Sequence, residues 1–361
     1  MAHDLVGVLS KYQPQFPKDY QPGVAIIGCG KIVQLQHLPA YKKYRVKVVG
    51  VFDILPDVAE QVRSTFEIPK VYRTLEDLLE DPRVEVVDIA THPDVRFPLV
   101  QQAIEAGKHV LVQKPLAMTV EEAKRIIEMA SQKGVKVAVN QNGRWAPPWR
   151  VATLLIEQGV LGEVFAITHL FETSFKWTIG TKFDQIRQWL LYDYAIHWID
   201  ISRCWMGSTP VEWVRAENYR LSLQPEESKT PWGAIVEIRW QGGKTAVIRS
   251  VGGAQVTTRN HPFWIHGTEG TLRGSVMNRE WIELEQNHTV TQFHLEGSWY
   301  PDGFGGTIGE LFSSIVEHRE PFNSPSHNLL SLQLTLAACT SADREGERIT
   351  LDSLTELSNT R

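Results

Sequence analysis

Short, continuous apolar runs alternate with amphipathic stretches of helical length over the first 140 residues of the chain. The apolar runs cover residues 24–27, 46–52, 84–90, 109–112 and 135–139, and the amphipathic stretches cover residues 55–66, 94–106 and 120–133. Continuous apolar runs are typical of strands buried on both faces of a parallel sheet. Gly107 and Gly134 stand where two of the helices should end. The pattern predicts an α/β domain with a doubly wound parallel sheet over residues 23–142.

The rest of the chain has a different pattern, which predicts an α+β domain over residues 143–361. Segments of alternating polarity cover residues 211–219, 234–240, 244–251 and 281–284, and helical patterns cover residues 147–158, 192–206, 308–317 and 329–342. The pair Gly242-Gly243 is typical of a hairpin turn. We expect an antiparallel sheet with helices on one side. Residues 1–22 are polar and rich in proline, and we expect an arm that precedes the fold.

Composition narrows the class of protein. A chain of 361 residues, 42% of them apolar, is long enough for two domains with large cores. A formal net charge of −5 argues against a nucleic-acid partner, because such proteins usually carry a basic surface. Three scattered cysteines predict neither a disulfide framework nor a zinc site. No stretch reads as a signal peptide or a membrane span, so we expect a cytoplasmic protein with no membrane partner.

A glycine-rich turn follows the first apolar run and opens a helical stretch. Its residues are Gly28, Cys29, Gly30, Lys31 and Ile32. Gly28 permits a tight turn, Gly30 lets the backbone approach a pyrophosphate, and the helix N-terminus offers free N–H groups to that anion. Val33 replaces the small residue usual at the third fingerprint position. In this context the motif predicts a Rossmann dinucleotide-binding domain, with Gly28, Gly30, Lys31 and Ile32 at the cofactor.

Asp53 ends the second apolar run, where a carboxylate can accept hydrogen bonds from the adenosine ribose hydroxyls. It would repel a 2′-phosphate, and no Arg or Lys follows it directly, so NAD is expected rather than NADP. The alternative is that Asp53 only caps the helix that starts near Leu55.

Three further side chains are candidates for catalysis. Lys114 closely follows the apolar run over residues 109–112, and the carboxyl ends of parallel strands face the ligand crevice. Asp193 and His197 have the i, i+4 spacing that puts two side chains on one face of a helix, where Asp193 can orient the imidazole of His197 for proton transfer. A surface lysine and a structural Asp–His pair remain the alternatives. His37, His261 and His266 form no metal-ligand pattern, so no metal is expected.

Taken in order, these pieces resemble the glucose–fructose oxidoreductase and inositol dehydrogenase family. The resemblance covers residues 23–351 and includes the glycine turn with residues 37–40, Asp53, residues 90–93, residues 103–115, residues 193–197 with Asp200, and the helix around residues 331–342. It implies that Thr91, His92, Pro93 and Gln113 also contact the cofactor. It further implies a large open, mostly antiparallel C-terminal sheet that joins subunits into a homodimer or homotetramer.

The resemblance also implies a catalytic trio, which falls on Lys114, Asp193 and His197. Lys114 would bind the reacting hydroxyl, His197 would be the acid and base, and Asp193 would position the substrate or His197. The family usually has Glu where this chain has Gln113, and Arg96 stands where His is common. Because glutamine keeps the shape and the hydrogen bonding of glutamate, we expect Gln113→Glu to leave activity within about tenfold.

The expected function is hydride transfer between NAD and a secondary hydroxyl or ketone of a sugar, glycoside or polyol. Arg144, Trp145, Lys176 and Trp177 are candidate substrate contacts, with Tyr300 a weaker one, and packing is the alternative for each. Redox-neutral cleavage of a glycoside through a transient keto-sugar is an alternative activity, and a non-catalytic NAD-binding regulator is another.

Overall fold

The computed structural model describes residues 5–358, which divide into two compact units. The parallel-sheet unit comprises residues 13–145 and 300–329. The antiparallel-sheet unit comprises residues 146–299 and 330–358, together with the described residues up to Tyr12. Each unit is therefore built from separate stretches of the chain, which differs from the continuous domains that the sequence suggests. Residues 1–4 of the expected arm lie outside the described residues.

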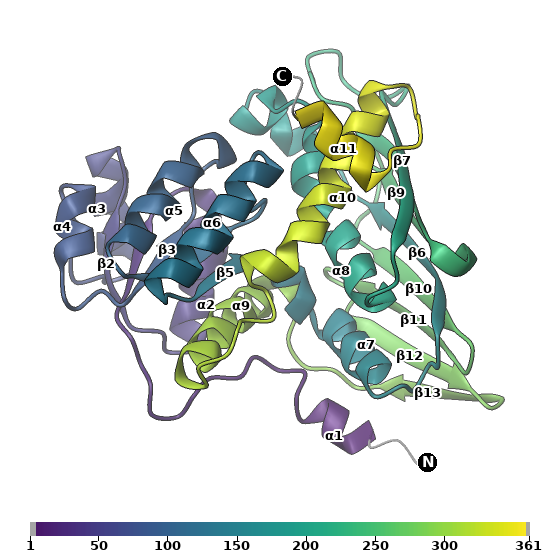
Figure 1. The fold of residues 1–361 in the computed structure, drawn as a ribbon, viewed down its shortest axis with the longest axis horizontal. Helices are drawn as coiled ribbons and strands as arrows, with labels where there is room; N and C mark the ends of the chain where they lie inside the picture. The colour runs from purple at the N-terminus through teal and green to yellow at the C-terminus, as the bar shows by residue number, and fades with distance from the viewer. Residues whose placement is uncertain (1–4, 359–361) are drawn as a thin grey trace. The chain divides into compact units, whose positions relative to one another are not determined.

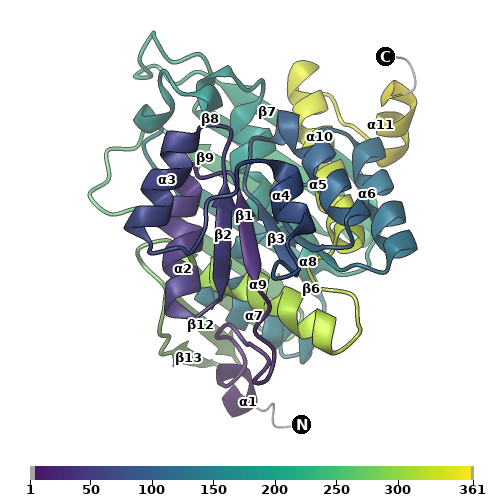
Figure 2. The ribbon, with the colours of Figure 1, turned by 90° about the vertical axis from the view of Figure 1, so that its left-hand side faces the viewer.

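The parallel-sheet unit contains all five strands that the apolar runs predict, with bounds close to the expected ones. They are β1 (Val24–Ile27), β2 (Val48–Phe52), β3 (Val86–Ile89), β4 (His109–Gln113) and β5 (Val137–Asn140). All pair in parallel, in the order β2-β1-β3-β4-β5. Figure 2 shows β1 and β2 side by side, with β3 on the other side of β1. The strand order reverses between β1 and β3, and ligands of such sheets bind at this switch point.

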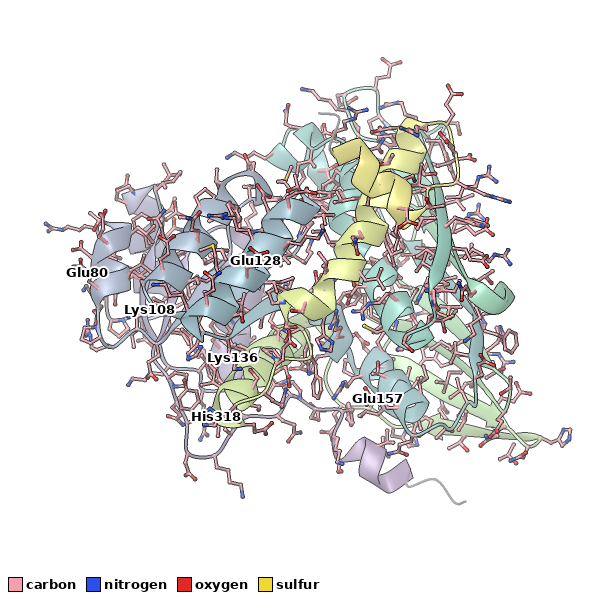
Figure 3. The ribbon with its side chains drawn as sticks, viewed as in Figure 1. Glu80, Lys108, Glu128, Lys136, Glu157 and His318 are labelled. Carbon is pink, nitrogen blue, oxygen red and sulfur yellow. The ribbon has the colours of Figure 1, made fainter. Side chains whose placement is uncertain are left out.

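Helices connect the strands of this unit. They are η1 (Val33–His37), α2 (Leu38–Lys43), α3 (Pro56–Thr65), α4 (Leu75–Glu80), η2 (Pro93–Val95), α5 (Arg96–Glu105), α6 (Val120–Lys133) and η3 (Asn142–Trp145). Figure 1 shows α5 and α6 packed next to each other. Polar side chains such as Glu80 and Glu128 project from these helices (Figure 3) and are exposed.

Residues from far along the chain complete the core of the parallel-sheet unit. Helix α9 (Trp299–Val316) contributes Phe304, Ile308, Leu311 and Phe312, which are buried in one cluster with residues of β1. The arm also belongs here in part, because the ring of Phe16 stacks on Tyr44 with centroids 5.4 Å apart. The sequence pattern gives α9 as a helix, but it does not show which core the helix joins.

The antiparallel-sheet unit contains eight strands. They are β6 (Val164–Glu172), β7 (Val211–Tyr219), β8 (Gly233–Trp240), β9 (Thr245–Val251), β10 (His261–Gly267), β11 (Thr271–Val276), β12 (Trp281–Gln286) and β13 (Thr289–Phe293). Their order is β13-β12-β11-β10-β6-β9-β8-β7, and within the described residues all neighbours are antiparallel except β6 and β9. The predicted fold class is confirmed, including the turn at Gly242-Gly243, which joins β8 to β9 through η7 (Gln241–Gly243).

The remaining helices include α7 (Pro147–Glu157) and α8 (Ile196–Met206), which pack against the eight-stranded sheet. The others are α1 (Leu5–Leu9), η4 (Lys176–Thr178), η5 (Lys182–Gln185), η6 (Leu190–Tyr194), α10 (Pro325–Asp343) and α11 (Leu351–Ser358). None of the described helices is both long and apolar enough to cross a membrane.

Tryptophans form much of the layer between α7, α8 and the sheet. Trp149 packs edge to face against Trp198 and Trp205, with centroids 5.8 and 6.1 Å apart. The ring of Trp299 packs against that of Trp149, with the two ring centroids 4.9 Å apart. Each such ring buries a large apolar area, and edge-to-face pairs add further stabilisation. Most of the chain's 12 tryptophans therefore need no explanation beyond packing.

We expect Thr119→Ala to lower the free energy of unfolding by about 1 kcal/mol. The Thr119 hydroxyl accepts a hydrogen bond from the Glu122 N–H at 3.1 Å and caps α6, and the alanine leaves that N–H unpaired. Urea unfolding followed by circular dichroism measures the loss. Lys124→Ala, at an exposed position of the same helix, is the control and should change the midpoint little. Equal midpoints for both variants would contradict the capping role.

Candidate active site

The turn after β1 requires glycine at its first position. Gly28 has φ = 94°, in the left-handed region, and its N–H donates to the Phe52 carbonyl at 2.8 Å. A Cβ at this position would lie 2.8 Å from the carbonyl oxygen of Ala90, which follows β3. The turn can therefore approach the end of β3 only because residue 28 has no side chain.

The space beside Gly30 is open. A Cβ built on Gly30 meets no atom within 4 Å, and the N–H groups of Val33 and Gln34 both point back to the Gly30 carbonyl at the start of the helix. Val33 is fully buried in the core as the first residue of the π-helical turn η1, so the bulkier residue at the third fingerprint position is accommodated. Lys31 and Ile32 are exposed at this helix start.

The side chain of Asp53, which directly follows β2, hydrogen-bonds the glycine turn after β1. Its Oδ2 accepts from the Cys29 N–H at 2.7 Å and its Oδ1 accepts from the Leu55 N–H at 2.9 Å. The second bond is a local turn contact with Leu55, the residue that precedes α3. The N-terminus of α3 has no side-chain cap hydrogen bond, so Asp53 does not cap the helix as the alternative predicted. Each carboxylate oxygen has two acceptor sites, so one on each remains for a ribose hydroxyl.

Cys29, between the two glycines, is a structural residue of this turn. Its side chain is buried, and burial, followed by the nearby Asp53 carboxylate, raises the pKa of the thiol to about 12. Because the thiolate is the nucleophilic form, this cysteine stays inert at neutral pH.

Lys114 lies directly after β4, as the sequence predicts, in a loop that neighbouring groups hold in place. Its N–H donates to the Gln113 side-chain oxygen at 2.8 Å. The guanidinium of Arg96 donates to the carbonyl of Pro115 and to that of Thr91. Arg96 is buried, and it joins the loop after β3 to the loop after β4. The sequence singled out Arg96 without a role, and the structure supplies one.

These residues fit a dinucleotide. The open space at Gly30 is the kind of approach that a pyrophosphate needs, and the helix start beside it offers backbone N–H groups. The acceptor sites of Asp53 suit the ribose. Thr91, His92 and Pro93 follow β3, next to the switch point, and the Thr91 hydroxyl is buried without a hydrogen-bond partner among the described residues.

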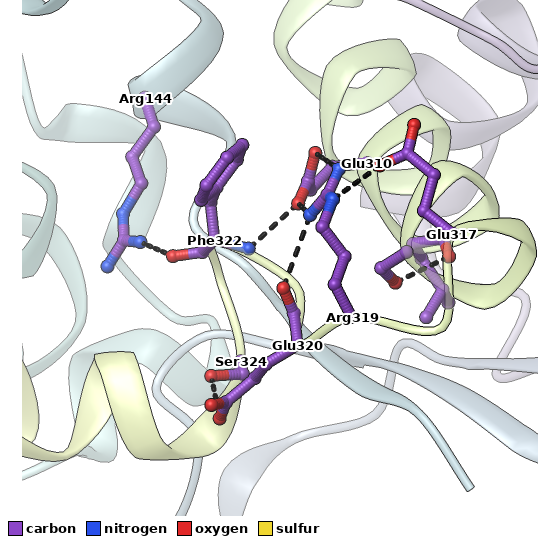
Figure 4. A network of polar contacts seen from close by, with 9 residues as sticks. Arg144, Glu310, Glu317, Arg319, Glu320, Phe322 and Ser324 are labelled. Carbon is purple, nitrogen blue, oxygen red and sulfur yellow. Dashed lines mark hydrogen bonds and ion pairs between the residues drawn. The ribbon is translucent and has the colours of Figure 1, made fainter.

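Arg144 and Trp145, in η3 after β5, have packing roles in the structure. The Arg144 guanidinium donates to the Phe322 carbonyl at 2.6 Å (Figure 4), and the residue is buried. The Phe322 N–H in turn donates to Glu310, which pairs with Arg319. Trp145 is buried against Gly306, where a Cβ would clash with the indole. Substrate contact by these two residues stays a prediction.

Asp193 and His197 lie on helical backbone in the antiparallel-sheet unit. Asp193 is in the π-helical turn η6, and His197 is in the first turn of α8. Both residues are buried, and the imidazole meets the Trp299 ring edge to face at 5.2 Å. Asp200, one turn further along α8, accepts a hydrogen bond from Ser331 at 2.6 Å. The predicted helical placement is therefore observed, across a junction between π and α turns.

Trp177 is the most exposed tryptophan among the described residues, at 46% exposure. Its ring is supported by edge-to-face contacts with Phe183 and Trp189, at 5.5 and 5.6 Å. Lys176 beside it is also exposed. Substrate contact by Lys176 and Trp177 stays a prediction.

Three other histidines, His37, His169 and His261, are buried and belong to the packed interior. Burial lowers the pKa of His169 and His261 to about 3, so both are neutral. His37 is buried in the parallel-sheet unit and hydrogen-bonds Asp88. Among residues 5–358, no group of three His, Cys, Asp or Glu side chains could hold a metal ion.

The fold and the glycine turn define an NAD-binding oxidoreductase. Residues 23–141 match the model for the NAD-binding Rossmann domain of the GFO_IDH_MocA oxidoreductase family, and residues 154–351 match the model for its C-terminal alpha/beta domain. The chain belongs to this family, which confirms the resemblance seen in the sequence and the choice of NAD.

Individual relatives are also oxidoreductases by name. An uncharacterized oxidoreductase of Synechocystis is 32% identical over 47% of this chain, a match that spans 44% of that protein. The D-apiose dehydrogenase of Paraburkholderia graminis is 25% identical over 91% of this chain and 90% of its own length. A solved oxidoreductase of Agrobacterium radiobacter, in complex with NAD+, L-tartaric acid and magnesium, shares the fold with a TM-score of 0.81. It is 22% identical, and the match covers 93% of this chain and all of that one.

Two glycine variants should separate NAD binding from folding. Gly30→Ala should keep the melting temperature within about 2 °C, because its Cβ meets no protein atom, while NAD affinity falls at least about tenfold. Gly28→Ala should destabilise the protein by about 1–3 kcal/mol, because of the positive φ and the Ala90 carbonyl. Calorimetric titration with NAD and thermal melts measure both. A Gly30→Ala protein that binds NAD as the wild type does would contradict the assignment.

Proposed function

We propose that this chain transfers hydride between NAD and a secondary hydroxyl or ketone of a sugar, glycoside or polyol. The observation that carries the proposal is that an NAD-binding oxidoreductase has Lys114 after β4 and two buried groups suited to acid–base chemistry, Asp193 and His197, beside the start of α8. The relative named D-apiose dehydrogenase supports a carbohydrate as the substrate.

Each of the three residues has a distinct role in the proposal. NAD, when bound, accepts a hydride from the alcohol carbon, and the reduced form returns it to a ketone. Lys114 donates a hydrogen bond to the reacting oxygen and stabilises its developing negative charge. His197 takes the hydroxyl proton in oxidation and returns it in reduction, and Asp193 positions His197 or the substrate.

The surroundings of His197 suit a proton-transfer group. The imidazole is buried and its ring lies perpendicular to that of Trp299, which restricts its orientation. Positioned proton transfer of this kind contributes about 10²–10⁴ in rate. Trp177, with its exposed and supported ring, stacks on a sugar face, and the exposed Lys176 donates to sugar hydroxyls. Arg144 and Trp145 are the further substrate contacts of the proposal.

We further propose that the eight-stranded sheet joins subunits into a dimer or tetramer and that the enzyme works in the cytoplasm. Ile235 on β8 and Val247 on β9 are exposed apolar side chains on one face of this sheet. Glu237 and Arg249 lie opposite them on the same face, so this surface offers another copy of the chain both apolar and charged contacts.

The assignment predicts a growth of NADH absorbance when the purified protein is mixed with NAD and one class within a panel of sugars, polyols and glycosides. The substrate class that gives the signal identifies the reacting group. Release of free sugar from a glycoside without NADH would instead indicate redox-neutral cleavage. No turnover of any panel member in either direction, including ketone reduction by NADH, would contradict the proposal.

With a substrate in hand, His197→Ala should lower kcat by at least about 100-fold while NAD affinity stays unchanged, because proton transfer is lost and the cofactor residues are untouched. Steady-state kinetics and NAD titration test this. His288→Ala, at an exposed position before β13, is the matched control. Full activity of His197→Ala would remove this residue from the mechanism.

A further inference from the structure

The side chain of Gln113, the last residue of β4, is buried and both ends of its amide are used. Its oxygen accepts from the Lys114 N–H at 2.8 Å, and its nitrogen lies 3.2 Å from Nε2 of His37. A backbone N–H can only donate, so the amide oxygen must face Lys114. The amide NH₂ must therefore face His37.

This orientation fixes the protonation of His37. An NH₂ group can only donate, so His37 Nε2 has to be the unprotonated, accepting nitrogen. The proton then sits on Nδ1, which lies 2.7 Å from Oδ2 of Asp88 and donates to it. The hydrogen bond at one ring nitrogen sets the state of the other. His37 is thus neutral and in the Nδ1–H tautomer.

The rest of the network is consistent with this tautomer. Asn140 Nδ2 lies 3.3 Å from the same Nε2, and the Asn140 oxygen faces the Thr307 hydroxyl at 2.9 Å. The Tyr41 hydroxyl donates to Asp88 Oδ2 at 2.6 Å. Oδ2 of Asp88 therefore accepts from both His37 and Tyr41. All these residues belong to the parallel-sheet unit, and His37, Tyr41, Asp88 and Asn140 are fully buried or nearly so.

We propose that Gln113 is a positioning residue that holds the backbone of Lys114 through a buried Asp88–His37–Gln113 relay. The relay starts on β3, passes through η1 and ends on the N–H of the residue that binds the reacting oxygen. Each hydrogen bond in the relay fixes the orientation of the side chain that follows it. The last hydrogen bond, from the Lys114 N–H to Gln113, therefore holds the Lys114 backbone in one position. The role given to Lys114 rests on the proposed function, whereas the His37 tautomer does not.

The relay also explains what the substitution Gln113→Glu changes. One oxygen of the new carboxylate can still accept from the Lys114 N–H, while the other would face His37 Nε2 and require a proton there. His37 would then be an imidazolium between two carboxylates. Gln113→Glu keeps the hold on Lys114 and changes the charge of His37, whereas Gln113→Met removes both contacts.

The first test is spectroscopic and needs no substrate. Long-range proton–nitrogen correlation spectra of protein labelled with ¹⁵N-histidine report which ring nitrogens carry a proton. The His37 signals are those missing from His37→Asn. We expect His37 of the wild type to be neutral with the proton on Nδ1, and His37 of Gln113→Glu to be protonated on both nitrogens at the same pH. A protonated Nε2 in the wild type would overturn the relay, whatever the enzyme's substrate.

The second test is kinetic and asks whether the relay positions Lys114. Gln113→Met should lower kcat about 100-fold, the cost of misplacing a reacting group by about 1 Å, with the dissociation constant of NAD within about threefold of the wild type. Gln113→Glu should stay within about tenfold of the wild type, because it restores an acceptor for the Lys114 N–H. Rescue by glutamate but not by methionine is the result expected of a positioning residue.

Gln224→Met is the matched control, because Gln224 is a buried glutamine of the antiparallel-sheet unit whose amide is also bonded at both ends. The loss of stability and of kcat in Gln224→Met measures the general effect of replacing a buried, hydrogen-bonded glutamine with methionine. If Gln113→Met lowers kcat no more than Gln224→Met does, the positioning role is wrong. If the tautomers are as expected but no substrate is turned over, the relay stands and the proposed function fails.

Discussion

The left-handed backbone conformation of Gly28 is the constraint on which the geometry of the NAD-binding turn depends. Strand β1 lies between β2 and β3, so the chain must leave the sheet between two occupied neighbours. It does so with φ = 94° and with no room for a Cβ beside the Ala90 carbonyl. The Asp53 carboxylate then holds the Cys29 N–H. The direction of the following helix, and with it the position of its free N–H groups, follows from these contacts.

A second set of buried polar contacts fixes the loops after β3 and β4. Arg96 joins the Thr91 and Pro115 carbonyls, and Gln113 bonds both Lys114 and His37. Burying such groups is costly unless they are bonded, so a satisfied network favours one arrangement over its alternatives. Arg96 and Gln113, two of the residues at which the sequence departs from the pattern of the family that it resembles, are both part of these contacts. Both side chains bond backbone groups of the loop that carries Lys114.

Aromatic packing surrounds the start of α8 in the antiparallel-sheet unit. His197 is surrounded by aromatic rings, with Trp299 perpendicular to it and Trp198 at 6.3 Å. Tryptophan packing holds α8 on the sheet, so the residues at the start of this helix sit on a rigid element. Trp177, in contrast, is about half exposed, and its ring packs edge to face against Phe183 and Trp189.

Patterns among neighbouring residues were enough to predict most of the secondary-structure elements and the cofactor motif. The apolar runs predicted all five parallel strands, and the predicted bounds of α6 agree with the structure to the residue. The glycine turn and Asp53 also lie where their motif places them. These features could be predicted because each depends on residues that are neighbours in the chain. Only the tertiary structure decided which distant groups meet. Arg144 donates to a carbonyl 178 residues away, His37 pairs with Asp88 51 residues away, and the apolar face of α9 completes the core around β1. These contacts depend on how distant helices and strands pack against one another. Such packing produces no periodicity or fixed spacing in the sequence from which the contacts could be predicted.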